Sequence, residues 1–261
     1  MRVLYLTIDN INDPVILAQT FPFLGRLAAL PGVDGIDLFA LRKDGGERYR
    51  AYLPAGVFRV RIGKNHGIWH PLSLLTLLRF ALRAWSLSRA GTLLIGRNPV
   101  SLLCLFPAAL RRGTRLVLDY RGLLSEEYVL QGKITRRGWW HRLLRGLEAW
   151  ALQRADVILC VSDRLRRRSI RWRPTIAERL RVVPCCYDPR MVRRDETAIE
   201  RLRVELNAAA DFLLAYAGSL SAWNRPEAIL AVFRAFRAIR PDARLLLLTH
   251  DLAKAQVIFG A

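Results

Sequence analysis

Short, continuous apolar runs recur along this chain, and they restrict its fold more than any other feature. Examples are LLI, LVLDY and VILCVS, in which apolar residues do not alternate with polar ones. A strand with one face in water alternates, whereas a strand covered on both faces is apolar throughout, as parallel sheets require. The sequence therefore predicts an α/β domain with a doubly wound parallel sheet and helices on both faces.

These runs are separated by stretches long enough for helices. We expect strands at residues 3–8, 35–41, 57–62, 92–95, 115–119, 157–161 and 180–183. Residues 9–14 indicate a turn that caps a first helix, which runs to about Leu30. The first part of the chain is thus expected to be one Rossmann-like unit.

A polar and charged stretch follows the seventh expected strand and marks a boundary. Apolar strand character returns at residues 212–217, followed by a turn at Gly218, a helix at 226–239 and a strand at 244–249. We therefore expect a first domain at residues 1–195. Residues 196–261 are expected to hold a linker and the first βαβ unit of a second, incomplete Rossmann-like domain.

The 261 residues carry a formal net charge of +20, from 42 basic and 22 acidic residues. Such a positive surface attracts phosphates, anionic lipid or nucleic acid. No RNP signature, zinc finger or basic region with heptads accompanies it, so we do not expect nucleic acid as a partner. We favour an anionic membrane surface, because Trp139, Trp140 and Trp172 lie among the arginines.

Two expected helices, at residues 73–89 and 134–154, are candidates for membrane contact. In the first, leucines and Trp85 surround a narrow polar strip that includes Arg79 and Arg83. A helix packed on the sheet explains this first pattern better, and for the second the two explanations are equally good. No signal sequence or long apolar run is present, so we expect a cytoplasmic protein, at most peripheral at the inner face of the membrane.

In an open parallel sheet, ligands lie beyond the carboxyl ends of the strands, and three loops there carry notable polar residues. The first loop holds Asp119, Arg121, Gly122, Glu126 and Glu127. The paired acids could equally cap a helix. No metal is expected, because the chain has no HExxH motif and its histidines and cysteines lack metal-ligand spacing.

The other two loops precede expected helices. Ser162 follows the strand VILCV and opens an Arg-rich helix, where capping explains it as well as a ligand does. In the third loop, free backbone amides at Gly218 and Ser219, a helix N-terminus and the cation Arg225 could together hold a diphosphate.

Taken in this order, the three loops resemble those of family 4 glycosyltransferases with the GT-B fold. LVLDYRGLLSEE is similar to the family's strand and loop with D-x-R-G and paired acids, and YAGSLSAWNRPEAILAVFRAF is similar to the opening of its donor-binding domain. LEAWALQRADVILCVSDRLRR is similar to the segment between them. VVPCCYDPRMV is similar to the family's interdomain stretch, through Val183, Pro184, Asp188 and Val192.

The resemblance implies a retaining transfer that needs no metal, from a nucleotide-diphosphate sugar to a glycan or lipid-linked acceptor. It implies an acceptor cleft near the first two loops and donor phosphates near Gly218, Ser219 and Arg225. Two departures are the lack of glycine in residues 9–14, and Ser219 and Asn224 where many relatives have Arg and Lys. Arg225 is expected to take over part of the phosphate contact.

The chain ends at Ala261, before the region where the family's paired-glutamate motif is expected. We therefore expect the donor site to be incomplete in these 261 residues. The alternative function is a non-catalytic module that docks an acceptor or a membrane and needs a partner to supply the other half.

Overall fold

The computed structural model describes residues 1–43, 45–53, 58–67, 70–185 and 194–260. The chain divides into two compact units, each described below by itself. Unit 1 comprises residues 1–125 and 137–188, and unit 2 comprises residues 126–136 and 189–261. The predicted division into residues 1–195 and 196–261 stays a prediction.

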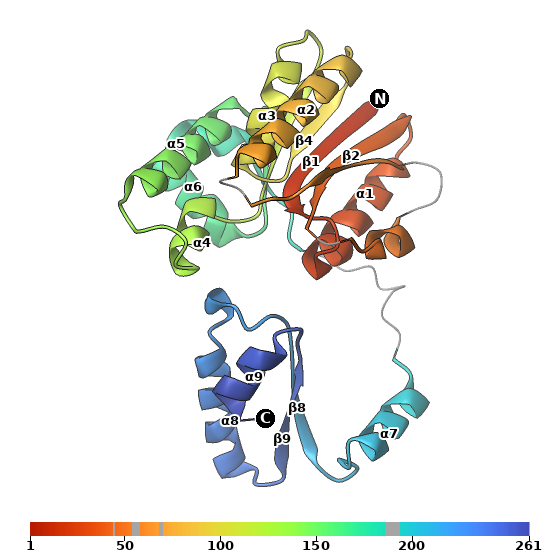
Figure 1. Ribbon diagram of the computed structural model, residues 1–261, viewed down its shortest axis with the longest axis vertical. Helices are drawn as coiled ribbons and strands as arrows, with labels where there is room; N and C mark the ends of the chain where they lie inside the picture. Colours follow the sequence, from red (N-terminus) through yellow and green to blue (C-terminus); the bar gives the residue numbers. More distant parts are fainter. Residues whose placement is uncertain (44, 54–57, 68–69, 186–193, 261) are drawn as a thin grey trace. The chain divides into compact units, whose positions relative to one another are not determined.

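Unit 1 is built on a parallel sheet with the order β3-β2-β1-β4-β5-β6-β7 (Figure 1). The strands are β1 (Arg2–Asn10), β2 (Gly35–Arg42), β3 (Phe58–Lys64), β4 (Leu93–Gly96), β5 (Arg115–Tyr120), β6 (Val157–Cys160) and β7 (Leu180–Val182). β1 pairs in parallel with both β2 and β4, so the strand order reverses between β1 and β4. The predicted doubly wound parallel sheet is confirmed.

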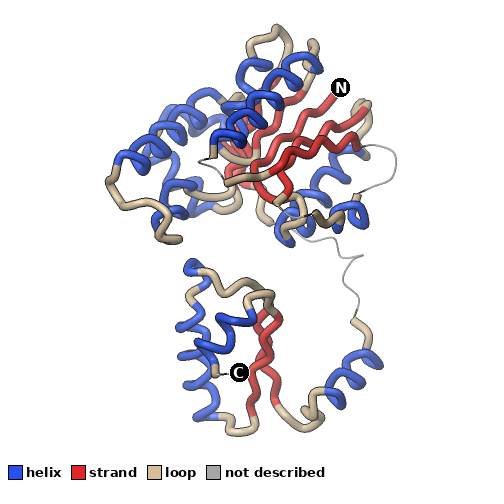
Figure 2. The backbone as a smooth tube through the Cα atoms, in the orientation of Figure 1, coloured by secondary structure: helices blue, strands red, loops and turns tan. Residues whose placement is uncertain are grey.

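Helices cover both faces of this sheet (Figure 2). They are the π-helical turn η1 (Ile16–Thr20), α1 (Phe21–Ala28), the 3-10 helix η2 (Arg48–Tyr52), α2 (Pro71–Leu87), α3 (Pro99–Ala109), α5 (Trp139–Arg154), α6 (Asp163–Trp172) and the 3-10 helix η3 (Pro174–Arg179). The helix α4 (Leu124–Leu130) begins in unit 1 and ends in unit 2. Leu4 and Leu6 of β1 belong to one core cluster with residues of α2, α3 and α5. Val3 and Tyr5, which point to the opposite face, belong to a second cluster with residues of η1 and α1.

Two expectations about the helices were wrong. The helix expected from residue 134 begins at Trp139, because Arg137 has a left-handed φ of 65° and Gly138 is extended at the N-cap. Between β2 and β3 the described residues form the short 3-10 helix η2 instead of an α-helix. Val57, the first residue of the expected third strand, lies outside the described residues.

Unit 2 contains the βαβ unit that the sequence predicts. Its elements are α7 (Glu196–Glu205), β8 (Phe212–Ala217), the 3-10 helix η5 (Ala222–Asn224), α8 (Pro226–Ile239), β9 (Ala243–Leu248) and α9 (Leu252–Phe259). β8 and β9 pair in parallel from Phe212 with Ala243 to Ala217 with Leu248. The helix α9 was not predicted. Among all described residues, no helix combines the length and the apolar character needed to cross a bilayer.

Candidate functional site

The reversal of strand order between β1 and β4 places three polar side chains together. Asp9 lies near the carboxyl end of β1, Arg97 directly follows β4, and Asp119 lies near the end of β5. Ligands of doubly wound folds bind at such a switch point. The carboxyl edge at β1, β4 and β5 is therefore the candidate site.

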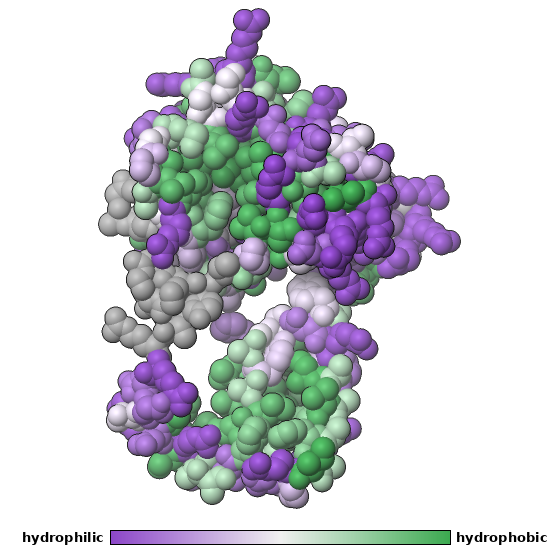
Figure 3. Space-filling model, turned by 180° about the vertical axis from the view of Figure 1, so that it is seen from behind, coloured by the Kyte–Doolittle hydropathy of each residue, from purple (hydrophilic) through white to green (hydrophobic). Residues whose placement is uncertain are grey.

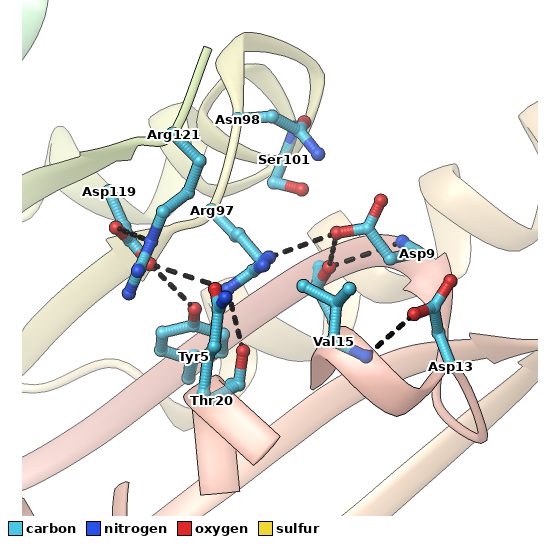
Figure 4. A network of polar contacts seen from close by, with 12 residues as sticks. Tyr5, Asp9, Asp13, Val15, Thr20, Arg97, Asn98, Ser101, Asp119 and Arg121 are labelled. Atoms are coloured by element: carbon cyan, nitrogen blue, oxygen red, sulfur yellow. Dashed lines mark hydrogen bonds and ion pairs between the residues drawn. The ribbon is translucent and has the colours of Figure 1, made fainter. Parts of the chain in front are cut away.

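Arg97 is the centre of this network (Figure 4). Its Nε donates to Asp9 Oδ2 at 3.1 Å, and its Nη1 donates to Thr20 Oγ1 at 2.6 Å. Nη1 also lies 3.9 Å from Asp119 Oδ2. Only 7% of the Arg97 side chain is exposed, so its charge is held by these partners instead of by water. Arg97 thus ties β1, the turn η1 and β5 together.

The local sequence around Arg97 explains why it points into the network. A Cβ at Gly96 would lie 2.7 Å from Leu102 N, so only glycine lets the start of α3 pack against the end of β4. Asn98 then caps α3 by accepting a hydrogen bond from Ser101 N–H at 2.9 Å. The sharp turn from strand to helix leaves Arg97 at the sheet edge.

Asp119 is buried and fully used within the network. Its Oδ1 accepts from Arg121 Nε at 2.7 Å, and its Oδ2 accepts from Tyr5 O–H at 2.9 Å. Only 4% of its side chain is exposed. Asp119, predicted for the acceptor cleft, therefore organises the edge and presents no oxygen to a ligand.

Burial shapes the ionisation of the network. Burial, and next the negative charge of Asp119, raise the pKa of the Tyr5 phenol above its ordinary value. For Arg97, burial alone lowers the pKa, but Tyr5, Asp9 and Asp119 outweigh it and raise the pKa overall. The guanidinium therefore stays charged inside the fold.

The remaining predicted residues of the first loop lie after β5. Arg121 donates from Nη1 to Cys185 Sγ at 3.4 Å in addition to its bond with Asp119. Gly122 lies half-buried at a bend before α4. Glu126 and Glu127 form the first turn of α4, where Glu126 accepts from Arg136 Nη2 at 2.8 Å.

Ser162 acts as a helix cap in this structure. Its Oγ accepts from Leu165 N–H at 3.2 Å, which fixes the N-terminus of α6. The capping explanation that the sequence left open is thus observed. A ligand role for Ser162 stays a prediction.

In unit 2, the prediction of a free amide at Gly218 was wrong. The Gly218 N–H donates to Leu248 O at 3.0 Å, because the ladder between β8 and β9 extends one bond beyond the strands. The carbonyl of Ser219 accepts from Tyr216 O–H and Asn224 Nδ2, each at 2.7 Å. Among the described residues, the Ser219 N–H has no hydrogen-bond partner. The Ser219 N–H is therefore open to a phosphate, whereas the Gly218 N–H is not.

Arg225 lies at the N-terminus of α8 in a strained backbone conformation. Its φ is 49°, in the left-handed region, and Pro226 begins the helix. Its guanidinium has no ion-pair partner in the described part of the chain. Asp188 and Val192, two positions of the resemblance, lie outside the described residues.

Three important residues of unit 1 were missed from the sequence, namely Asp9, Arg97 and Glu148. Arg97 directly follows an expected strand and precedes an Asn-Pro helix start, a signal that the carboxyl-end rule could have used. The buried Glu148 of α5 gave no such signal. It accepts from Ser125 N–H at 2.9 Å and from Ser125 Oγ–H at 3.0 Å. Glu148 thereby fixes the start of α4.

The opposite, amino edge of the sheet has a cavity of about 740 Å³. Its buried Asp37 is already paired with Arg2 at 2.6 Å and with Arg61 at 3.3 Å. Because this carboxylate is neutralised and far from the carboxyl ends of the strands, we place the site at the carboxyl edge. Within the described residues, no group of three or more Asp, Glu, His and Cys side chains is placed to hold a metal ion.

Two solved proteins show a fold similar to that of this chain. Anabaena Alr3699/HepE in complex with UDP-glucose is 16% identical with a TM-score of 0.62, and the match covers 100% of this chain and 65% of that one. Sucrose-phosphate synthase (tll1590) from Thermosynechococcus elongatus is 18% identical with a TM-score of 0.61, with 95% and 62% covered. The chain thus spans less than two thirds of the length of these proteins.

Comparison by sequence gives one match, to a family model. No curated protein matches this chain. Residues 34–190 match the family model described as Glycosyltransferase Family 4. Because this match covers more than half of the chain and the similar solved structures share the GT-B fold, the protein belongs to Glycosyltransferase Family 4.

Proposed function

We propose that this protein transfers a sugar from a nucleotide-diphosphate sugar to a hydroxyl group of an acceptor. The observation that carries the proposal is the polar network at the β1–β4 switch point of a family 4 chain. The similar Anabaena HepE structures contain UDP-glucose, UDP with glucose, and UDP. A retaining course and a reaction without a required metal are part of the same proposal.

The donor phosphates are proposed to lie at the start of α8. Among the described residues, the Ser219 amide has no hydrogen-bond partner and the Arg225 guanidinium has no ion-pair partner, and both groups suit a diphosphate. Gly218 contributes space instead of an amide, because a Cβ there would lie 2.9 Å from the Tyr216 hydroxyl oxygen. This assignment keeps the three predicted residues but changes the role of Gly218.

Calorimetric titration of the chain with UDP and GDP tests this donor assignment. Arg225→Gln is expected to weaken nucleotide binding about tenfold, the size of one charge-assisted hydrogen bond. Arg234→Gln removes an equally exposed cation of α8 and is the matched control, with unchanged affinity expected. No binding of either nucleotide, or equal affinities for both variants, contradicts the assignment.

The acceptor is proposed to be a glycan or a lipid-linked sugar that enters unit 1 at its carboxyl edge. The predicted residues Arg121, Gly122 and Ser162 of unit 1 remain candidates for contacts there. Glu126 and Glu127, which belong to unit 2, stay predicted acceptor residues. Asp119 acts indirectly in this proposal, because its carboxylate is enclosed by Tyr5, Arg97 and Arg121. The family match favours this function over a non-catalytic docking module.

An anionic membrane surface is proposed as a further partner because of α2. The helix buries Phe80 and Ala84, as expected for a helix packed on the sheet. One apolar stripe of the same helix nevertheless faces outward. The stripe consists of Leu74, Leu78, Leu82 and Trp85, at helical spacing. Arg79 and Arg83 of the same helix are exposed beside it. Apolar side chains bordered by arginines suit the headgroup region of anionic lipid.

Arginines of α6 add to this positive surface. Arg164, Arg167, Arg168 and Arg171 are exposed. Seen from behind, hydrophilic residues gather over the side of unit 1 that carries α5 and α6 (Figure 3). The charge would attract the protein to an anionic surface, and the stripe of α2 would then insert.

Co-sedimentation with phosphatidylglycerol vesicles at two salt concentrations tests membrane docking. The variant Leu74→Ser, Leu78→Ser, Leu82→Ser is expected to lose most vesicle binding, and high salt is expected to weaken wild-type binding. The control replaces Val232, Ile239 and Val257, three exposed apolar residues of unit 2, by serine. Equal binding by both triple variants contradicts docking through α2. Binding to vesicles without any affinity for UDP or GDP would favour the non-catalytic module.

A further inference from the structure

The two carboxylates that contact Arg97 differ in what they leave for a ligand. Both oxygens of Asp119 have partners within unit 1, and its side chain is buried. The Asp9 side chain is 44% exposed. Of the two, only Asp9 can therefore meet a ligand at the edge of the sheet.

One Asp9 oxygen is held and the other is not. Oδ2 accepts from Thr7 Oγ1–H at 2.8 Å and from Arg97 Nε at 3.1 Å, while the Asp9 N–H donates to Thr7 Oγ1 at 3.1 Å. Within the described residues, Oδ1 has no hydrogen-bond partner. The carboxylate is thus fixed on one side and presents a strong acceptor on the other.

Arg97 supplies the rigidity of this arrangement. Its side chain is almost fully buried and is anchored to the buried Thr20, the last residue of the turn η1. Its charge is shared with Asp119 at the next strand. Arg97 therefore cannot move without breaking contacts to β1, η1 and β5, and it holds Asp9 in one orientation.

We propose that Asp9 binds the acceptor, with Oδ1 accepting a hydrogen bond from a sugar hydroxyl, and that Arg97 is its positioning residue. This rests on the proposed function, since the ligand is the acceptor of the transfer. A fixed carboxylate oxygen at the switch point suits a hydroxyl donor, and the other carboxylate of the network, Asp119, is enclosed. Asp9 replaces Asp119 as the acidic contact of unit 1.

Asp13 provides a matched control on the same loop. Its Oδ1 accepts from Val15 N–H at 2.8 Å and so fixes the local turn. Asp13→Asn removes one negative charge four residues from Asp9 and keeps an oxygen for this bond. Any general effect of lost charge near the edge will therefore appear in this variant as well.

The test measures binding of methyl glucoside, methyl galactoside and methyl mannoside to the full chain by saturation-transfer NMR. UDP affinity is measured by calorimetry in parallel. Asp9→Asn is expected to weaken glycoside binding about tenfold, because a charge-assisted bond becomes a neutral one. Asp13→Asn is expected to bind as the wild type, and UDP affinity is expected to stay unchanged in both.

Positioning by Arg97 is tested by Arg97→Lys, which keeps the charge and loses the two-armed contact. The expected result is weakened glycoside binding with unchanged UDP affinity and an unchanged circular dichroism spectrum, which shows that unit 1 is still folded. If this variant does not fold, Thr20→Val removes a single anchor of Arg97 and is expected to weaken glycoside binding by about threefold. Unchanged glycoside binding in the folded variant overturns the positioning role.

The outcomes separate this inference from the proposed function. Equal glycoside binding by the wild type and Asp9→Asn overturns the role of Asp9, whatever the affinity for UDP. UDP binding without binding of any glycoside also overturns it and leaves the donor assignment standing. Glycoside binding that is lost in Asp9→Asn supports it even if UDP does not bind, and in that case only the donor assignment fails.

Discussion

The two units use the same strand and helix pattern but bury it to different extents. In unit 1 the middle of β1 is buried without interruption, and the charged Arg97 and Asp119 lie inside the fold. In unit 2 the strands β8 and β9 are also apolar, yet of their residues only Ala243 is buried. Hydrophobic residues spread over much of the visible face of unit 2 (Figure 3).

The difference shows that apolar strands need neighbours on both sides. β1 lies between β2 and β4 and beneath helices, whereas β8 and β9 have only each other as strand partners in the described chain. Val257 of α9 is 86% exposed, as a result of the same lack of cover. A two-stranded sheet is marginal by itself, so unit 1 should carry most of the stability.

Hydrogen exchange of the whole chain should show the largest contrast. Amides of β8 and β9 are expected to exchange at least about 100-fold faster than those of β1, β4 and β5, because local opening exposes less apolar surface. Peptide-resolved mass spectrometry measures both sets in one sample. Equal protection of the two sheets would contradict the lower stability expected for unit 2.

Removal of a buried glutamate should lower the unfolding free energy far more than removal of an exposed one. Glu148→Ala leaves the Ser125 N–H and the Arg145 cation without their buried acceptor and is expected to cost about 3 kcal/mol of unfolding free energy. Glu196→Ala removes an exposed pair with Arg194 in unit 2 and should change little. Urea denaturation followed by circular dichroism measures both. A small effect of Glu148→Ala would show that the start of α4 does not depend on it.

Two glycines of unit 1 should respond in opposite directions. Gly96→Ala places a Cβ against the backbone of Leu102 and is expected to destabilise by about 1–3 kcal/mol. Gly146→Ala, in the interior of α5 with no atom within 4 Å of the added Cβ, is expected to stabilise by about 0.5–1 kcal/mol. Thermal melts of the two variants and the wild type measure which is more stable. The same sign for both would contradict the tight contact between β4 and α3.

Because of the buried Tyr5 phenol, we expect the stability of the fold to fall at alkaline pH. Its pKa is raised in the folded chain, so above the ordinary value of 10.0 the unfolded chain loses its proton first. Stability contributed by this group is therefore complete below about pH 10 and falls above it by about 1.4 kcal/mol per pH unit. Melting curves at pH 8 and pH 10.5 should show a smaller loss in Tyr5→Phe than in the wild type. An equal loss would contradict the burial of the Tyr5 phenol beside Asp119.

Much of the fold follows from local sequence. The helix expected at residues 226–239 matches α8, because Pro226 suits the first helical position. The start of α5 was missed because the left-handed Arg137 is not encoded in any residue preference. The helix α9, a stretch of only eight residues, was also missed.

The site was less predictable, because its contacts join distant segments. Arg97 contacts Asp9 and Thr20, which lie 88 and 77 residues earlier in the chain. Asp119 was found as a polar residue at a strand end, but its enclosure depends on Tyr5, 114 residues away. Sequence patterns indicated the carboxyl edge of the sheet, and only the packed network shows which carboxylate there is exposed.

Turnover in the wild type, Asp9→Asn and Asp13→Asn tests the central claim that the carboxyl edge of unit 1 is the working site. The measurement is release of UDP or GDP from a panel of nucleotide sugars, with and without hydroxyl acceptors. We expect acceptor-dependent release by the wild type and Asp13→Asn, and release by Asp9→Asn lower by about tenfold. Equal release by Asp9→Asn and the wild type, or no acceptor-dependent release from any donor that binds, would contradict the claim.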